Sequence, residues 1–428
     1  MKLIRLALPV YVELLTSVVA VSLIDLFWVS GLGGQAVAAV TIATTTEYLA
    51  LGVVLAVGTG TTVLVGRRDG QEPITPVIRT AWLLWAAVSL AVAIPGVLLR
   101  EPLAHLFTGD AVTASLTADF YLVSLAGIPV FYAQTLADGI FKGRGDTRTP
   151  MRAALLCNAL VAALDPLFIY GLDFGIQGAA WATVAARVAA LAVSLTLLVR
   201  RVPRDSRAGA SRADALEIVR IGLPMSGDFL ARALVGMLTV EVVGGFGVAS
   251  LAGYGIGMKI MLAGVMAFYA LRQATMIQTA RSGDAGPALG YGLLAGLAVA
   301  AVLALTAPVV TGLFTQDPSV AATATDFLRW MPLYLVPFGG LIAVGGVLQA
   351  SGRGGRLLVA TLAGFALQLP AAYALGSLVG VTGVWLAMAA GAVLALLTAT
   401  PSARPNRSRP GSGSGVLEPG ERGADPVD

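Results

Sequence analysis

Two aspartates inside long apolar segments are the residues of this chain whose chemistry is most informative. Asp25 lies in the segment VSLIDLFWV and Asp165 in LDPLFIYG. An ionisable side chain at bilayer depth costs at least about 2.5 to 3.5 kcal/mol, so it normally faces a cavity or a partner. Two carboxylates in one partly dehydrated pocket cannot both ionise cheaply, so one of them is expected to hold a proton. The same oxygens could coordinate Na⁺, and the residues alone leave the choice between the two ions open.

The depth of these residues in their helices predicts that they meet. With about 1.5 Å of rise per residue, Asp25, Asp165 and Thr183 each lie roughly 9 Å inside the outer ends of their helices. Asn158 precedes Asp165 by two helical turns and lies on the same face. We therefore predict a cation-coupling site made of Asp25, Asp165, Thr183 and Asn158. The alternative is a structural role, in which the aspartates only bind backbone groups or Arg187.

Two further acids occupy matching positions near the start of each half of the chain. Glu13 and Asp228 each follow a proline by four residues and lie near the inner ends of their helices. The pattern leaves two roles open for them. One is an inner gate, and the other is ion pairing with Arg5 and Arg232.

Other polar residues within the apolar segments are candidates for substrate contact or for packing. Glu241, in the outer part of the seventh apolar segment, is expected either to contact substrate or to serve as a local hydrogen-bond partner. Tyr132 is a candidate for the wall of a substrate cavity. Glu47 and Lys259 fall in matching second helices, where an ion pair across the two halves is one alternative.

The composition indicates a membrane protein. Hydrophobic residues make up 57% of the 428 residues and charged residues only 12%, whereas a soluble domain carries about 25% charged residues. The net charge of +4 does not indicate a nucleic-acid partner, because the basic residues form short clusters between apolar runs. Cys157 and His105 are the only residues of their types, which argues against a disulfide framework, a zinc site or Ser/His catalysis. We expect no enzyme activity and no cofactor.

The apolar runs predict an all-α integral membrane protein with twelve transmembrane helices. A helix needs about 20 apolar residues to cross the hydrocarbon core, and these runs lack the alternation of barrel strands. The expected spans are 4–31, 36–66, 74–99, 112–138, 149–171, 177–200, 214–244, 250–280, 286–313, 319–347, 355–377 and 381–400.

The basic residues predict the orientation. Lys and Arg concentrate in alternate connections, and translocation disfavours these residues on the outer side. Both termini should therefore be cytoplasmic, in a multi-pass protein of the bacterial plasma (inner) membrane. The tail 401–428 is rich in Pro, Gly, Ser, Arg and Glu, so we expect it to be disordered.

Internal similarity predicts two pseudo-symmetric six-helix lobes. The segment LALPVYVELL recurs as IGLPMSGDFL, and FGIQGAAWAT recurs as VGVTGVWLAM. An even number of spans per copy gives parallel repeats about an axis along the membrane normal. We expect a first lobe at 1–206 that carries the cation site, a second lobe at 207–400, and the tail 401–428. Asp165 aligns with Pro370, so the carboxylate pocket should belong to the first lobe alone.

The pattern resembles the multidrug and toxic compound extrusion (MATE) family, especially its prokaryotic DinF-like branch. The resemblance covers about residues 3–400 and rests on ALPVYVELL, GLGGQAVAAV, GRGDTRTPM, LDPLFIYG and GIQGAAWAT. It implies two lobes around a central cavity, alternating access, and export of cationic or amphipathic compounds driven by H⁺ or Na⁺. It also implies that Asp25, Asp165 and Thr183 are the first-lobe site.

The chain departs from the family pattern at two places. Where family members commonly carry an Asn four residues before the second Asp, this chain has Val161. Where some members carry a second-lobe carboxylate eight residues after the proline, it has Arg232. The first departure puts Na⁺ coordination in doubt, and the second argues against coupling through the second lobe.

These observations predict a secondary antiporter that exports organic cations or amphipathic small molecules in exchange for H⁺, with Na⁺ as the alternative ion. We expect it to act as a monomer, with membrane lipid and small-molecule substrates as its partners and no nucleic acid. The competing hypothesis is a flippase for lipid-linked oligosaccharides or peptidoglycan precursors, which would need several cations facing the cavity for pyrophosphate. An intramembrane enzyme is the third hypothesis, and no catalytic pattern supports it.

Overall fold

The computed structural model describes residues 2–202 and 209–403, and this part of the chain is helical with short connections. The tail 404–428 and part of the connection between the lobes, 203–208, lie outside the described residues, and so do the predictions made for them. The first lobe contains α1 (Lys2–Leu14), η1 (Leu15–Ala20), α2 (Val21–Val29), η2 (Ser30–Leu32), α3 (Gly34–Arg68), α4 (Thr75–Leu98), α5 (Arg100–Phe107), α6 (Ala111–Ala126), α7 (Ile128–Gly143), α8 (Arg148–Pro166), η3 (Leu167–Gly171) and α9 (Gly175–Arg201). The second contains α10 (Arg212–Gly244), α11 (Val248–Ser282), α12 (Ala288–Phe314), α13 (Pro318–Trp330), α14 (Pro332–Ala350), α15 (Gly354–Val379) and α16 (Val381–Ala403).

Each of the twelve predicted spans corresponds to one helix or to consecutive helices in the described chain. Ten of these helices are long and apolar enough to cross a membrane, or eleven if α6 and α7, bent by 45°, form one span. The helix α10 is not among them, because its charged residues lower its hydropathy. The short helix α5 was not predicted, since its eight residues REPLAHLF include three ionisable side chains.

Helix starts at equivalent places confirm the internal repeat. Gly33 and Gly247 precede the second long helix of each lobe with φ of 99° and 100°, a conformation that favours glycine. Asp110 and Asp317 cap α6 and α13 by accepting hydrogen bonds from the backbone N–H groups of the first turn. In both caps these hydrogen bonds lower the pKa of the aspartate.

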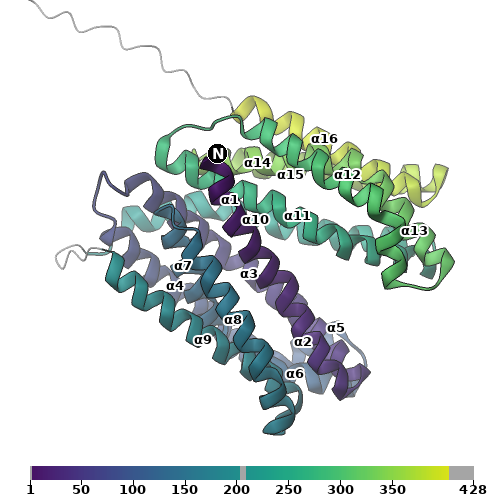
Figure 1. Cartoon of the computed structure of the whole chain (residues 1–428), viewed down its shortest axis with the longest axis horizontal. Coiled ribbons are helices and arrows are strands. Elements are labelled where there is room, and N and C mark those ends of the chain that lie inside the picture. Colours follow the sequence, from purple (N-terminus) through teal and green to yellow (C-terminus); the bar gives the residue numbers. More distant parts are fainter. Residues whose placement is uncertain (1, 203–208, 404–428) are drawn as a thin grey trace, which may run out of the picture.

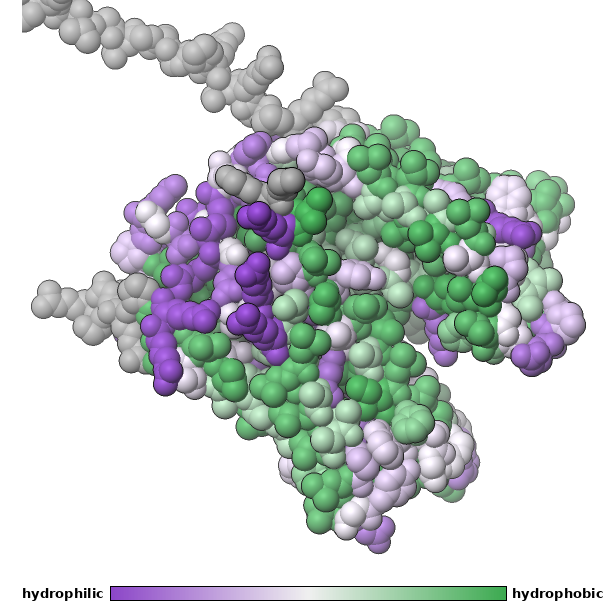
Figure 2. All heavy atoms as spheres, in the orientation of Figure 1, coloured by the Kyte–Doolittle hydropathy of each residue, from purple (hydrophilic) through white to green (hydrophobic). Residues whose placement is uncertain are grey.

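The two lobes form a wedge that is closed at one end (Figure 1). Across the junction, α3 packs against α10 and α1 packs against α11, so the first two spans of one lobe face the first two of the other. At the closed end lie the α3–α4 and α7–α8 connections with their basic residues, and we call this end the basic end. At the opposite end the surface is hollowed between the lobes (Figure 2).

Two glycines allow α3 and α10 to touch through their backbones near the basic end. A Cβ atom on Gly222 would overlap the Ala56 carbonyl group, and one on Gly60 would overlap the Ile218 carbonyl group. Because the obstacle in each case is backbone rather than a movable side chain, neither position has room for a larger residue.

Ion pairs reinforce the same junction. Arg67 of α3 lies 3.0 Å from Glu217 of α10 and donates to the Ala350 carbonyl of α14 at 2.7 Å. Asp69 accepts from Arg281 of α11 at 2.9 Å. Among the ion pairs of the described residues, those that join the two lobes all lie at the basic end.

We expect Gly222→Ala to lower the thermal unfolding midpoint of the protein in detergent. The added methyl group must push α10 away from α3, which corresponds to an overpacking cost of about 1 to 3 kcal/mol. Gly236→Ala on the same helix is the matched control, because a Cβ there meets nothing within 4 Å. A midpoint for Gly222→Ala as high as that of Gly236→Ala would contradict this view of the junction.

Candidate functional site

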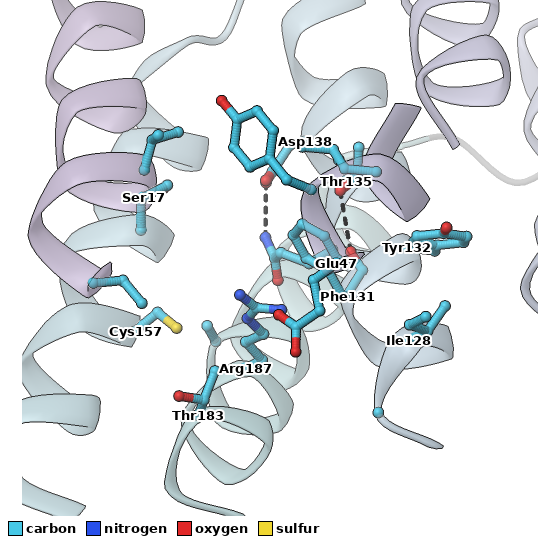
Figure 3. A pocket seen from close by; sticks show the side chains of 18 of the residues that line it. Ser17, Glu47, Ile128, Phe131, Tyr132, Thr135, Asp138, Cys157, Thr183 and Arg187 are labelled. Atoms are coloured by element: carbon cyan, nitrogen blue, oxygen red, sulfur yellow. Dashed lines mark hydrogen bonds between the residues drawn. The ribbon is translucent and has the colours of Figure 1, made fainter. Parts of the chain in front are cut away.

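A cavity of about 300 Å³ lies inside the first lobe. Its wall comes from the first-lobe helices, with Gln273 of α11 contributed by the second lobe. Figure 3 shows polar side chains from several helices pointing into this space. The charged residues of the wall are Glu13, Asp25, Glu47, Asp138, Lys142 and Arg187.

The structure places Asp25 beside Asp165. Asp25, on α2, is 6% exposed and lines the cavity, and Asp165, on the last turn of α8, is fully buried behind it. The two carboxyl groups are close enough to interact directly. The equal depths inferred from the sequence are therefore matched by helix rotations that turn both side chains toward one point.

Both helices are irregular next to these aspartates. The π-helical turn η1 precedes Asp25, and a second, η3, begins directly after Pro166. Proline has no N–H to donate, so it disrupts the normal α-helical ladder, and π-turns of this kind concentrate at functional sites. The irregular turn of the fifth span thus follows its proline directly, while that of the first span lies six residues beyond Pro9, at η1.

Several polar atoms at this place are buried without a hydrogen-bond partner in the described chain. They are Asp25 Oδ1, Asp165 Oδ1, Asp165 Oδ2 and Asn158 Nδ2. An unsatisfied carboxylate oxygen in a low-dielectric site is costly unless a proton or another cation binds it. These oxygens can therefore bind a proton or another small cation, although no group of three His, Cys, Asp or Glu residues suited to a metal occurs in the described residues.

The other two residues predicted for this site also lie in the cavity. Asn158 and Thr183 both contribute to its wall. Val161, at the position where an Asn is common in the family, is fully buried. Thr183 and Asn158 thus supply a hydroxyl and an amide to the cavity that Asp25 lines.

The middle of the cavity contains an acid and a base, Glu47 and Arg187, for which the sequence suggested other partners. Glu47 and Arg187 point toward one another across the cavity (Figure 3) and interact electrostatically. Arg187 also stacks over the Phe131 ring at 4.1 Å. The suggested Glu47–Lys259 pair is wrong, since Lys259 is exposed on α11 and Glu47 faces the first-lobe cavity.

Glu13 lies at the end of the cavity nearer the basic end. Its Oε1 accepts a hydrogen bond of 2.6 Å from Lys142 Nζ of α7. The suggested partner Arg5 is therefore wrong, and Arg5 is exposed. Lys142 falls in the predicted connection between the spans 112–138 and 149–171, whereas the structure places it in the last turn of α7. Its spacing of four residues from Asp138 was the available signal that both share one helix face.

The remaining predicted residues have different surroundings. Tyr132 lines the cavity, is fully buried, and donates its hydroxyl hydrogen to the Ala50 carbonyl at 2.5 Å. Glu241 is exposed on α10 and is not part of the cavity wall. The contact between Glu241 and substrate therefore stays a prediction without support from the cavity.

Comparisons with known proteins agree with this architecture. The MatE family pattern matches residues 9–167 and 224–374, one match in each lobe. The chain belongs to the MatE family. It is 26% identical to the "FAD transporter" of Shewanella oneidensis over 90% of both chains. It is 24% identical to the "Multidrug export protein MepA" of Staphylococcus aureus, over 81% of this chain and 80% of that protein. It also resembles a solved MOP superfamily transporter from Pyrococcus furiosus, with a TM-score of 0.86 and 25% identity over 94% of each chain.

The second lobe of this MatE-family transporter contains a compensated charge network instead of a carboxylate pocket. Asp228 accepts from Arg232 at 3.0 Å, from Arg272 at 3.2 Å and from the Thr361 hydroxyl at 2.7 Å. The ion pair with Arg232 that the sequence suggested is present, and Arg272 adds a second cation from α11. Asp228 is only 1% exposed, so its partners replace water almost entirely.

We expect Asp228→Asn to destabilise the protein strongly, because it leaves Arg232 and Arg272 without their shared carboxylate. Breaking a buried ion pair from one side typically costs about 3 to 5 kcal/mol. Adding Arg272→Met should restore part of the loss, since it removes one unpaired cation. Thermal unfolding in detergent tests this, with Asp173→Asn as the control on an exposed residue whose φ of 55° suits Asn. Equal midpoints for Asp228→Asn and Asp173→Asn would contradict the proposed structural role.

Proposed function

We propose that this chain is an antiporter that exports organic cations in exchange for protons, with Na⁺ as the alternative coupling ion. The observation that carries the proposal is the charge of the first-lobe cavity. Four carboxylates line it, against the two cations Lys142 and Arg187. A cavity with this excess of negative charge selects cationic cargo and accepts protons.

The walls of the cavity support the same class of cargo. Phe120, Phe131, Tyr48 and Tyr132 are among the lining residues. Aromatic faces attract organic cations through their quadrupoles and also bind apolar substituents. An amphipathic cation would use both kinds of wall.

The Asp25–Asp165 pair would couple the export of cargo to the entry of protons. Protonation of this pair would remove negative charge from the cavity and weaken the binding of a cationic cargo. Cargo binding would, by linkage, weaken proton binding to the same degree. The π-helical turns η1 and η3 would allow α2 and the end of α8 to shift when the charge of the pair changes.

The distribution of basic residues supports an orientation with the basic end in the cytoplasm. Both termini would then be cytoplasmic, in the bacterial inner membrane, and the hollow between the lobes would open outward. We propose that one chain is the transporting unit, since the cavity wall is complete within one chain.

The flippase alternative and the cargo named for one relative are less well supported by the cavity. Both a pyrophosphate-linked lipid and FAD carry anionic phosphates, which Arg or Lys side chains would have to bind. In this cavity Lys142 is paired with Glu13, and Arg187 faces Glu47. The negative charge of the cavity agrees better with the export of cationic drugs, and the second relative is named a multidrug export protein.

We expect Asp25→Asn and Asp165→Asn each to reduce proton-driven efflux of ethidium, a fluorescent organic cation, by at least about tenfold. The amides keep the size of the side chains but cannot exchange a proton. Transport into or out of proteoliposomes is followed under a proton gradient and, separately, under a sodium gradient. Asp173→Asn is the matched control, with the same chemical change at an exposed site outside the cavity.

The two gradients separate the coupling ions. Efflux under the proton gradient alone supports H⁺ exchange, and efflux under the sodium gradient alone supports Na⁺. Undiminished gradient-driven efflux in both aspartate variants would reject this site as the place of coupling.

A further inference from the structure

The part of the cavity nearest the basic end contains a second charged cluster, apart from the Asp25–Asp165 pair. Glu13 of α1 pairs with Lys142 of α7 at 2.6 Å, and both residues are at most 8% exposed. Asp138, one turn before Lys142 on α7, accepts from Gln134 at 2.7 Å (Figure 3). Glu13, Asp138 and Lys142 all line the cavity, and they interact with one another electrostatically. We call these three residues the inner station.

The inner station has unused acceptor capacity. Glu13 Oε2 and Gln134 Oε1 are buried and have no hydrogen-bond partner in the described chain. Glu13 is 7% exposed and belongs to the cavity wall, but its Oε2 is buried, so a ligand in the cavity reaches this oxygen only when a neighbouring side chain moves. A buried carboxylate oxygen without a donor indicates a place for a cationic or hydrogen-bond-donating ligand.

The charges around the station favour a monovalent cation. Two carboxylates and one ammonium leave a net charge of −1 when all three are ionised. Of the other charged residues of the wall, Glu47 on α3 and Arg187 on α9 face each other. Asp25 on α2 also lines the cavity and belongs to the pair with Asp165. From the remaining neighbouring elements the cavity receives Cys157 and Asn158 of α8 and Gln273 of α11, which carry no formal charge. One cationic group would neutralise the station.

We propose that the inner station is the docking site for the cationic group of the cargo as it enters from the basic end, and that Lys142 is a tethered competitor for Glu13. This inference rests on the proposed function, because cargo that is exported enters the cavity from the cytoplasmic side. Without cargo, the Lys142 ammonium occupies Glu13. A cargo cation takes this place by binding Glu13 Oε2 and Asp138 while Lys142 moves aside. The flexible four-carbon stem of lysine lets the ammonium move, and the cargo cation then replaces its charge beside Glu13.

The competition makes an unusual prediction. Lys142→Met should bind ethidium more tightly than the wild type, by about three- to tenfold, because the competitor is gone and the station carries one more negative charge. Glu13→Gln and Asp138→Asn should each bind it more weakly by a similar factor. A residue with a purely structural role would not tighten binding when it is removed.

Equilibrium binding of ethidium to the full-length chain in detergent, followed by fluorescence, measures these changes. The control is again Asp173→Asn, and size-exclusion profiles confirm that each variant is folded. The double variant Glu13→Gln/Lys142→Met removes both members of the ion pair together. It keeps the net charge of −1 that the station has in the wild type, so without Glu13 it should lose the tighter binding of Lys142→Met.

The outcomes distinguish this inference from the proposed function. Tighter binding by Lys142→Met, lost in the double variant, supports the docking site. Binding by Lys142→Met equal to or weaker than that of the wild type overturns it. If Lys142→Met alone does not fold, unchanged binding by Glu13→Gln and Asp138→Asn overturns it equally. A wild-type chain that moves ethidium under neither gradient would instead reject the proposed function.

Discussion

The structure depends on how each charge inside the membrane is compensated. A buried charge needs a partner of opposite sign, a set of hydrogen bonds or a wet cavity. In the second lobe, two arginines and a threonine hydroxyl donate hydrogen bonds to Asp228, so protein groups compensate its charge. In the first lobe, oxygens of Glu13, Asp25 and Asp165 are left without partners. The lobes have the same architecture, and this difference in compensation is the reason why we propose the first lobe as the place of coupling.

The junction between the lobes determines where a cavity can open. At the basic end, Gly60 and Gly222 bring two backbones together, and Arg67 and Asp69 connect to the opposite lobe. The first-lobe cavity is bounded on this side by Glu13 and Lys142, so the charges of the inner station lie close to the closed end of the wedge. Backbone contact between α3 and α10 and these ion pairs therefore hold the lobes together at this end.

Much of the fold and part of the site followed from the sequence for physical reasons. Apolar length decides which segments cross a bilayer, so all twelve spans could be placed within a few residues. Depth along a helix follows from residue counting, which is why Asp25, Asp165 and Thr183 could be brought to one level. Rotation about the helix axis does not follow from counting. That is why Glu47 and Glu13 were given the wrong partners.

Lys142 is a second example of a residue whose partner could not be predicted by counting along the sequence. The lysine belongs to a basic cluster, and such clusters usually lie in loops, so its position alone suggested topology and not chemistry. Lys142 reaches Glu13 because α1 and α7 both pack against α8, and this packing cannot be read from the position of the lysine in the sequence. The residues that orient a site can thus be found by spacing, such as that of Asp138 and Lys142, but their partners require the packed structure.

In the proposed exchange, a coupling proton and the cargo compete for the negative charge of one cavity. The most direct test is to add ethidium to the purified chain in weakly buffered detergent solution and to measure the protons that are released. We expect proton release that saturates together with ethidium binding and disappears in the Asp25→Asn/Asp165→Asn double variant. Ethidium binding with no proton release, at an affinity independent of both pH and Na⁺, would contradict it.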